Sequence, residues 1–459
     1  MLAKHVWWRR TFCAVLVAVF SVTAFSSAQG QTSIPDTPAG RTLRAFLDAF
    51  NSEDLAKLQA YVKEYGSQAS AEGLQGFSGQ TGGFTLLSIK TSTPDSITFM
   101  VEGKSDHLTA FGNLRLANVD PPKVKLLNIR AIPPGATVEQ ITLTPQIRDA
   151  TIRAISERLT EYYVYPDVAK QMITAVQEHQ KAGSYNAMTD GNEFANALMQ
   201  DLRAVSHDRH LFVSYVPYTT PDHGKEDGPR TPSAAEQAQY RKELEQENCA
   251  FSKVEILPGD IGYLKFGEFG DPEICGPVVT AAMTFLAHTN ALIFDVRENH
   301  GGDPAMVQLM VSYLFGEPTH INDLFNQHDG TTRQYWTLPS VAGPRYLDKP
   351  VYVLTSSQTF SGAEEFTYDL QTQKRATIVG EVTGGGAHPV EGMSAGEHFI
   401  IGVPIERPIN PITKKDWEGT GITPDVKVPA AEALESAQRL AQKKIAEGSA
   451  APALPAAKP

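Results

Sequence analysis

The sequence predicts an α/β protein in which a mostly parallel sheet is covered by helices. Between residues 250 and 435, short apolar runs typical of buried strands alternate with helical patterns. A mainly helical stretch, residues 140–216, comes before them. Residues 34–134 show helical spacing and then several strand-like runs, which indicates a small α+β domain in front of the larger unit.

Composition places the chain among folded globular proteins. The 459 residues are 41% hydrophobic and 20% charged, which excludes disorder of the whole chain. At about 100–200 residues per domain, this length indicates two to four domains. The formal net charge of −12, without a long basic run, argues against a nucleic-acid-binding protein.

The N-terminus is typical of a secretory signal peptide, predicted over residues 1–28. Lys4, Arg9 and Arg10 precede an apolar run at 11–25, and small residues follow it. We therefore expect an exported protein, periplasmic or extracellular. The alternative is an uncleaved membrane anchor, for which the run is short, and no later apolar run approaches the roughly 20 residues that span a bilayer.

The first domain, residues 34–134, begins with apolar side chains at helical spacing and ends at a Pro-Pro-Gly linker at 133–135. A Gly/Ser/Gln-rich stretch, residues 66–83, separates the helical part from the strands. The predicted strands are 84–89, 96–102, 108–116 and 124–132.

The larger unit divides into a helical subdomain (140–216), a polar segment (217–248) and an α/β core (250–435). The polar segment is interpreted as a surface insertion or a solvated helix, and the tail 448–459 as disordered. The predicted helices begin at 144, 168, 191, 278, 304 and 361, and the predicted strands are 211–216, 261–266, 291–295 and 351–354.

Ser361 is the sharpest candidate for chemistry. It follows a buried strand and begins a helix, so its hydroxyl would lie near free backbone N–H groups and the positive end of the helix dipole. The same Ser361-Gly-Ala-Glu364 pattern is also a capping box, in which the serine would only end the helix.

A serine nucleophile needs a base, and His207 and His210 are the leading candidates because a helical segment turns into a strand there. Their spacing also occurs in metal sites, but no nearby Cys or Glu completes a ligand set. A surface or core role is the alternative for each of them.

Two glycine loops are further candidates, and the first of them follows a predicted strand. One contains Gly301-Gly302 and the other runs from Thr383 to His388. Glycines let a backbone approach a ligand closely, although each loop alone is also compatible with an ordinary turn. Glu418 offers a carboxylate that could orient a base, or it could lie in a solvated turn.

Five segments in order, DVRENHGGD, YVLTSSQTFSGAEEF, ATIVGEVTGGGAHP, NPIT and WEGTGITPDV, resemble the S41 serine peptidases, the tail-specific (C-terminal processing) proteases and their relatives. The branch related to interphotoreceptor retinoid-binding protein and the tricorn core protease is the better match. The resemblance covers about residues 140–435. It implies a spiral core of the ClpP/crotonase type, while residues 34–134 faintly resemble an NTF2-like domain.

The resemblance assigns roles residue by residue. Ser361 matches the nucleophile, and Gly302 with the N–H of Gly362 matches the oxyanion hole. His210 matches the base and Glu418 its supporting carboxylate, as in the tricorn-like arrangement. The lysine of the classical tail-specific members is replaced by Gly386, which argues against a Ser–Lys dyad.

The resemblance assigns no catalytic role to Arg209 or His388. Arg209 stands where Gly or Ser is usual, which leaves His207 as a reserve base. His388 is interpreted as a loop histidine without a catalytic role.

The function expected from this resemblance is peptide-bond hydrolysis through an acyl-enzyme. No metal or cofactor is needed, the substrate is a protein or peptide, and a homo-oligomer is compatible with the sequence. The alternative is a non-catalytic protein that binds an apolar ligand, like the retinoid-binding relatives.

Cys249 and Cys275 remain after removal of a signal peptide. In an exported protein they could form a disulfide, and the alternative is two buried thiols.

Overall fold

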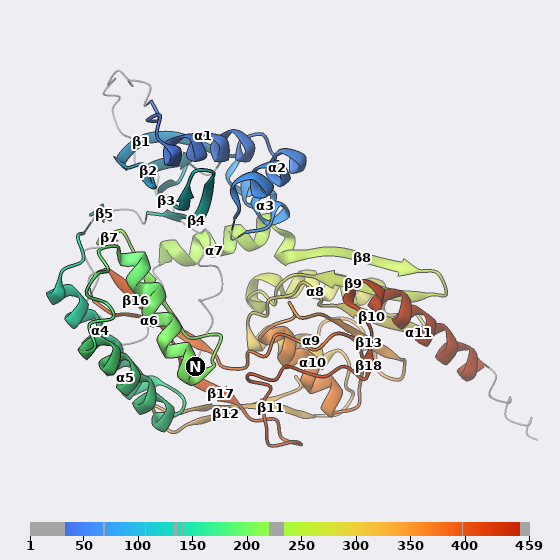
Figure 1. The fold of residues 1–459 in the computed structure, drawn as a ribbon. Coiled ribbons are helices and arrows are strands. Elements are labelled where there is room, and N and C mark those ends of the chain that lie inside the picture. The colour runs from blue at the N-terminus through green and yellow to red at the C-terminus, as the bar shows by residue number, and fades with distance from the viewer. Residues whose placement is uncertain are drawn as a thin grey trace, which may run out of the picture.

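The computed structural model describes residues 33–449 except 68, 106, 133–135, 140, 220–233 and 397. The expected signal peptide, and positions 450–459 of the expected tail, lie outside the described residues. Among the described residues, no helix is both long and apolar enough to cross a membrane. Figure 1 shows a small α+β unit at the top, a helical part on the left and a larger α/β part on the right.

The N-terminal unit packs three helices against a four-stranded antiparallel sheet with strands in sequence order. Its core contains Phe46, Phe50 and Phe99, all fully buried. The four strands correspond to the four predicted runs. The elements are α1 (Pro38–Phe50), α2 (Leu55–Tyr65), α3 (Ala71–Thr81), β1 (Phe84–Ser92), β2 (Ser96–Gly103), β3 (Thr109–Val119) and β4 (Pro122–Ala131).

Helix α3 lies within the Gly/Ser/Gln-rich stretch, to which the sequence analysis assigned no element. Its three glycines lower the helix propensity. Tertiary contacts compensate, because Ser70 caps the helix and the buried Ser78 hydroxyl donates a hydrogen bond to the carbonyl of Phe50. This element was missed because those contacts are not visible in local sequence.

The helical subdomain contains the three predicted helices, each within a few residues of its expected bounds. Thr144 caps the first helix, and Asp190 caps the third. These helices share a hydrophobic core with two strands that come much later in the chain, β15 (Val390–Ser394) and β16 (Phe399–Pro404). The three helices are α4 (Pro145–Tyr162), α5 (Pro166–Lys181) and α6 (Gly191–Ser206). The short strands around them are β5 (Thr137–Val138), β6 (Phe212–Tyr215) and β7 (Tyr218–Thr219).

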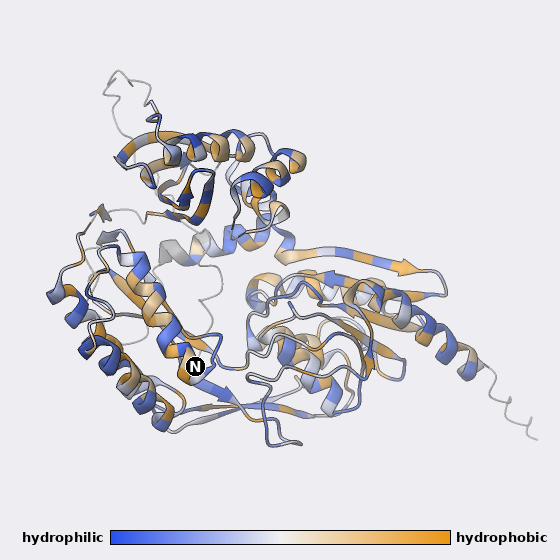
Figure 2. Cartoon of the chain, viewed as in Figure 1, coloured by the Kyte–Doolittle hydropathy of each residue, from blue (hydrophilic) through white to orange (hydrophobic). Residues whose placement is uncertain are grey.

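Part of the polar segment forms helix α7 (Ala234–Gln246), which Figure 2 shows as mostly hydrophilic along its coloured length. It is not simply a solvated helix, because Leu244 is 1% exposed and belongs to the core of the α/β part. After α7 comes a short 3₁₀ turn, η1 (Asn248–Ala250), where Cys249 forms a disulfide with Cys275.

A six-stranded sheet forms the centre of the α/β core, in the order β18-β14-β13-β10-β9-β8. All neighbouring pairs are parallel except the antiparallel pair of β8 and β9 at one edge. The bounds are β8 (Phe251–Leu257), β9 (Ile261–Phe266), β10 (Ala291–Asp295), β13 (Val351–Thr355), β14 (Thr377–Gly380) and β18 (Val426–Lys427).

Helices cover both faces of this sheet, as Figure 1 shows. Alternate residues of β10 separate the two faces: Leu292 and Phe294 face one apolar cluster, and Ala291 and Ile293 face the other. The first face is covered by α8 (Pro272–Leu286), α9 (Pro304–Ser312) and α10 (Gly362–Thr372), and the second by α11 (Ala433–Ser449). The last helix includes 448 and 449, which the sequence analysis had placed in the disordered tail.

A small antiparallel sheet, β12-β11-β17, runs along the bottom of Figure 1 between the helical subdomain and the α/β core. The sequence analysis did not identify these strands, nor β8, β15 and β16. The remaining bounds are β11 (His320–Asn326), β12 (Thr332–Trp336), β17 (Glu406–Pro408) and the 3₁₀ turn η2 (Ala430–Glu432).

Candidate active site

Ser361 lies between β13 and α10, as the N-cap of the helix. Its backbone has φ = 54° and ψ = −120°, in the region that favours glycine. Such a conformation costs of order 1–3 kcal/mol in a non-glycine residue and occurs often at functional sites. The Glu364 half of the predicted capping box is present, because the Glu364 carboxylate accepts the Ser361 N–H at 2.8 Å.

Glu364 also holds the second glycine loop against the start of α10. Its fully buried carboxylate accepts the hydroxyl of Thr383 at 2.5 Å and the N–H groups of Gly385 and Gly386 at 2.7 and 2.9 Å. Burial raises the pKa of Glu364, and these hydrogen bonds act against that shift. Glu364 was predicted only as part of a cap, because the loop that it anchors lies 19 to 22 positions away in the sequence.

The Gly301-Gly302 turn packs directly on the Ser361 segment. A Cβ atom on Gly301 would lie 2.5 Å from the backbone nitrogen of Gly362 and 2.9 Å from the Cβ of Ser361. A Cβ atom on Gly302, where φ is +142°, would lie 2.1 Å from the carbonyl oxygen of Phe269. Only glycine permits this approach, which brings the two expected oxyanion residues, Gly302 and Gly362, into contact range.

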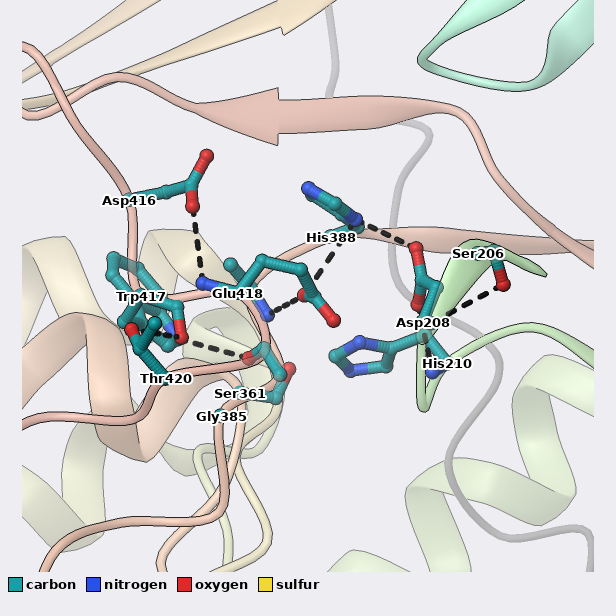
Figure 3. A network of polar contacts seen from close by, with 12 residues as sticks. Ser206, Asp208, His210, Ser361, Gly385, His388, Asp416, Trp417, Glu418 and Thr420 are labelled. Atoms are coloured by element: carbon teal, nitrogen blue, oxygen red, sulfur yellow. Dashed lines mark hydrogen bonds and ion pairs between the residues drawn. The ribbon is translucent and has the colours of Figure 1, made fainter. Parts of the chain in front are cut away.

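His210 reaches the site from the loop after α6. The loop is shaped by Asp208, whose carboxylate accepts the His210 N–H at 2.9 Å. The imidazole is 4.7 Å from the ring of Phe360 between centroids, and Gly386 leaves room for it, because a Cβ there would be 2.7 Å from His210 Cε1. Figure 3 shows the His210 ring pointing toward Ser361.

His207 does not join the site. It is exposed and ends α6 in a left-handed conformation, with its N–H bonded to the carbonyl of Arg203 at 2.8 Å. The structure gives Arg209 a role instead: its guanidinium donates to the carbonyl of Gly384 and lies 5.1 Å from the centre of the Phe360 ring. Arg209, which stands where Gly or Ser is usual, therefore connects the loop that carries His210 to the second glycine loop.

Glu418 lies above the His210 ring in Figure 3. One carboxylate oxygen accepts the Ala387 N–H at 2.5 Å, and the other is buried without a hydrogen-bond partner among the described residues. Burial and the nearby charge of Asp208 raise the pKa of Glu418 to about 7, while the charge of His388 acts in the opposite direction.

His388 is part of this arrangement, which sequence reasoning did not expect. Its Nδ1 lies 2.7 Å from a carboxylate oxygen of Asp208 and 3.5 Å from Glu418, and Figure 3 shows the three groups together. His388 and Asp208 are each 1% exposed. Burial alone would lower the pKa of His388, but the hydrogen bond and charge of Asp208, with the charge of Glu418, raise it.

Asp208, His388 and Glu418 are also the kinds of residue that ligate divalent cations. Their donor atoms lie within 4.8 Å of one another. In this arrangement, however, His388 Nδ1 is already hydrogen-bonded to Asp208, so these two residues form a buried ion pair beside Glu418.

A cavity opens beside Ser361. His210, Gly302, Gly362 and His388 line it, so the expected nucleophile, base and oxyanion residues meet at one cavity. Its more distant wall is partly apolar and carries charged side chains, among them Arg333, Glu365, Glu391 and Glu406.

Three solved structures match this chain at low sequence identity. A lipoprotein from Streptococcus agalactiae is 14% identical, with 66% of this chain and 99% of that chain covered and a TM-score of 0.43. The photosystem II D1 C-terminal processing protease is 14% identical over 66% and 99%, with a TM-score of 0.41. The tricorn protease is 13% identical over 79% of this chain and 41% of that chain, with a TM-score of 0.39.

Two family models match the part of the chain that contains the site. Residues 137–258 match the N-terminal domain of peptidase S41 in eukaryotic IRBP, and residues 260–428 match peptidase family S41. The two matches are separated by a single residue and include every expected site residue, from His207 to Glu418. The chain therefore belongs to peptidase family S41 and is a serine-type peptidase.

Proposed function

We propose that this protein is an exported serine peptidase with Ser361 as its nucleophile, His210 as its general base and Glu418 as the carboxylate that supports the base. One observation carries this proposal: Ser361 begins α10 in a strained backbone, against a glycine turn, with His210 directed toward it. Strain, free helix N–H groups and a nearby base are what a nucleophilic serine requires.

The reaction proceeds in two halves. Ser361 Oγ attacks the peptide carbonyl carbon while His210 takes the hydroxyl proton, and His210 then gives that proton to the departing amine. Water attacks the acyl-enzyme in the second half, again losing a proton to His210. That proton returns to Ser361 Oγ as the carboxylic product leaves.

The negative charge on the tetrahedral oxygen is received by the N–H groups of Gly302 and Gly362. Donors of this kind typically contribute about 3 kcal/mol each to transition-state stabilisation. An ionised Glu418 stabilises the positive charge that His210 acquires in the same step, as the carboxylate of a catalytic triad does.

Labelling with a fluorophosphonate probe tests the assignment without knowledge of the substrate. We expect the wild-type chain to be labelled at Ser361, Ser361→Ala to lose all labelling, and His210→Ala to be labelled at least 100-fold more slowly. Ser357→Ala, a serine exposed in the same loop, is the matched control and keeps its labelling.

Absence of labelling in the folded wild type, under conditions that label a control hydrolase, would overturn the proposal. If the unlabelled protein instead bound an apolar ligand with an affinity unaffected by Ser361→Ala, the alternative of a binding protein would replace it. The exported location is tested separately, by the N-terminal sequence of the protein recovered from its host.

A further inference from the structure

A buried ion pair joins the helical subdomain to the glycine loop beside the site. Asp208, after α6, and His388, at the end of the glycine loop, are 180 positions apart in sequence and 2.7 Å apart between Oδ2 and Nδ1. Both side chains are 1% exposed. Burying a charged pair carries a large desolvation cost, so the pair is weak as a stabilising device and invites a functional explanation.

The pair fixes the base and its supporting carboxylate together. The other oxygen of Asp208 accepts the His210 N–H at 2.9 Å, so Asp208 positions the backbone of the base. The residue before His388, Ala387, donates its N–H to Glu418 at 2.5 Å. Figure 3 shows the Glu418 carboxylate between the rings of His388 and His210.

Charge gives His388 a second effect on Glu418. Burial and the negative charge of Asp208 favour the protonated form of Glu418, whereas a protonated His388 at 3.5 Å favours the carboxylate. A protonated Glu418 could not stabilise the imidazolium of His210. Among the described residues, Arg203, Tyr163, Tyr165 and Asp416 are other charged or titratable groups that interact with this cluster, and Arg407 lies against Tyr165.

We propose that His388 is a positioning residue of the active site: paired with Asp208, it keeps the Glu418 carboxylate ionised and in place behind His210. This proposal rests on the proposed function, because it assigns a role relative to Ser361, His210 and Glu418. His388 acts through Glu418 and takes no proton from the nucleophile.

The pH dependence of fluorophosphonate labelling of the full chain tests this role. In His388→Gln, Glu418 loses the nearby positive charge, so we expect the acid limb of the labelling-rate profile to move upward by about one pH unit. Labelling at pH 7, close to the pKa of about 7 that Glu418 has in the wild type, falls about 5-fold and recovers above pH 9, where Glu418 is ionised in both proteins.

His398→Gln is the matched control. His398 is also buried, at 3% exposure, but its Nδ1 contacts the carbonyl of Val216 at 3.2 Å and it does not line the cavity. We expect its profile to match the wild type. A His388→Gln protein that is slower by one constant factor at every pH, with an unmoved acid limb, would show a purely structural role and overturn the proposal.

The Asp208→Asn variant covers the case in which His388→Gln fails to fold, and it also allows a double-mutant cycle where both variants fold. Asp208→Asn keeps the size of the side chain and removes its charge, and we expect it also to slow labelling and to alter the acid limb. If the variants fold, the double mutant with His388→Gln should be slowed by clearly less than the product of the two single effects, because the residues act as a pair.

Additive effects in the cycle, or an Asp208→Asn profile identical to that of the wild type, would contradict the proposal. Labelling separates failure of the proposed function from failure of the proposed role of His388. An unlabelled wild type refutes the proposed function, whereas a labelled wild type with an unmoved His388→Gln profile refutes only the role of His388.

Discussion

Close contacts between backbone atoms determine the geometry around Ser361. Gly302 approaches the carbonyl of Phe269 so closely that a methyl group cannot fit, and its φ of +142° is strained for any L side chain. The turn therefore depends on glycine for its shape as well as for its N–H group. A substitution there should damage the oxyanion site more than it damages the fold.

We predict that Gly302→Ala lowers kcat about 100- to 1,000-fold, the typical effect of losing one oxyanion donor. Gly330→Ala is the matched control: it also has a positive φ, +68°, but a Cβ there would meet nothing within 4 Å. Its cost is confined to backbone strain, about 1 kcal/mol of stability. Steady-state kinetics with a peptide substrate, beside thermal unfolding of both variants, checks this, and equal kcat values would contradict it.

Site residues were predicted from the sequence where the signal lies in a short segment of the chain. Ser361, Gly302 and Gly362 lie in short motifs, and the structure brings them together with His210 at one cavity. The contact of His388 with Asp208 was not predicted, because Asp208 is 180 positions away and no local pattern identifies such a contact. His207 was retained as a reserve because sequence does not show that it ends α6.

Among helices and strands too, those with a strong local signal in the sequence were predicted, and those stabilised by distant contacts were missed. The buried strands β9 and β10 were predicted residue for residue, since continuous apolar runs are strong signals. Helix α3 was missed because its stability comes from packing on α1 and not from its glycine-rich sequence. Helix α8 begins at Pro272, six residues before the predicted start, since Asp271 caps it and Pro277 is tolerated inside it.

The disulfide is the covalent link between two such elements, η1 and α8. Cys249 and Cys275 are 26 positions apart, so the bond restricts the unfolded chain over a loop of that length. We predict that the Cys249→Ser/Cys275→Ser variant loses about 3 kcal/mol of unfolding free energy.

Urea denaturation of the oxidised wild type and of the variant measures this loss. Dithiothreitol should destabilise the wild type and leave the variant unchanged, which serves as the control. A wild type whose midpoint does not respond to full reduction would contradict the prediction.

For the whole molecule, buried ionisable groups set the pH range of greatest stability. Burial raises the pKa of Glu365 and of Glu418 to about 7, so each group favours the fold when protonated and destabilises it when ionised. His388, whose pKa is raised by Asp208 despite burial, adds stability that is lost as pH rises through its folded pKa. The two carboxyl groups weaken the fold as the pH rises from about 4.5 toward 7, and His388 does so as the pH rises above its usual pKa of 6.5.

Asp295 limits the range on the acid side. Burial alone would raise its pKa, but hydrogen bonds from Arg297 and Tyr263 lower it, so its contribution is present above the usual value of 3.8 and is lost at lower pH. Together these groups predict greatest stability in acidic solution, between about pH 4 and about pH 5.

We predict that Glu365→Gln stabilises the protein at pH 8, by on the order of 2 kcal/mol, and changes little at pH 5. Glutamine can still accept the hydrogen bond that Asn322 donates to Glu365 at 2.9 Å, so the substitution removes charge and keeps the contact. Glu245→Gln, at an exposed position on α7, is the control and should follow the wild type at both values. Urea unfolding at pH 5 and pH 8 measures the difference. If wild type and Glu365→Gln lose the same unfolding free energy between the two pH values, ionisation of Glu365 is not what weakens the fold above neutrality.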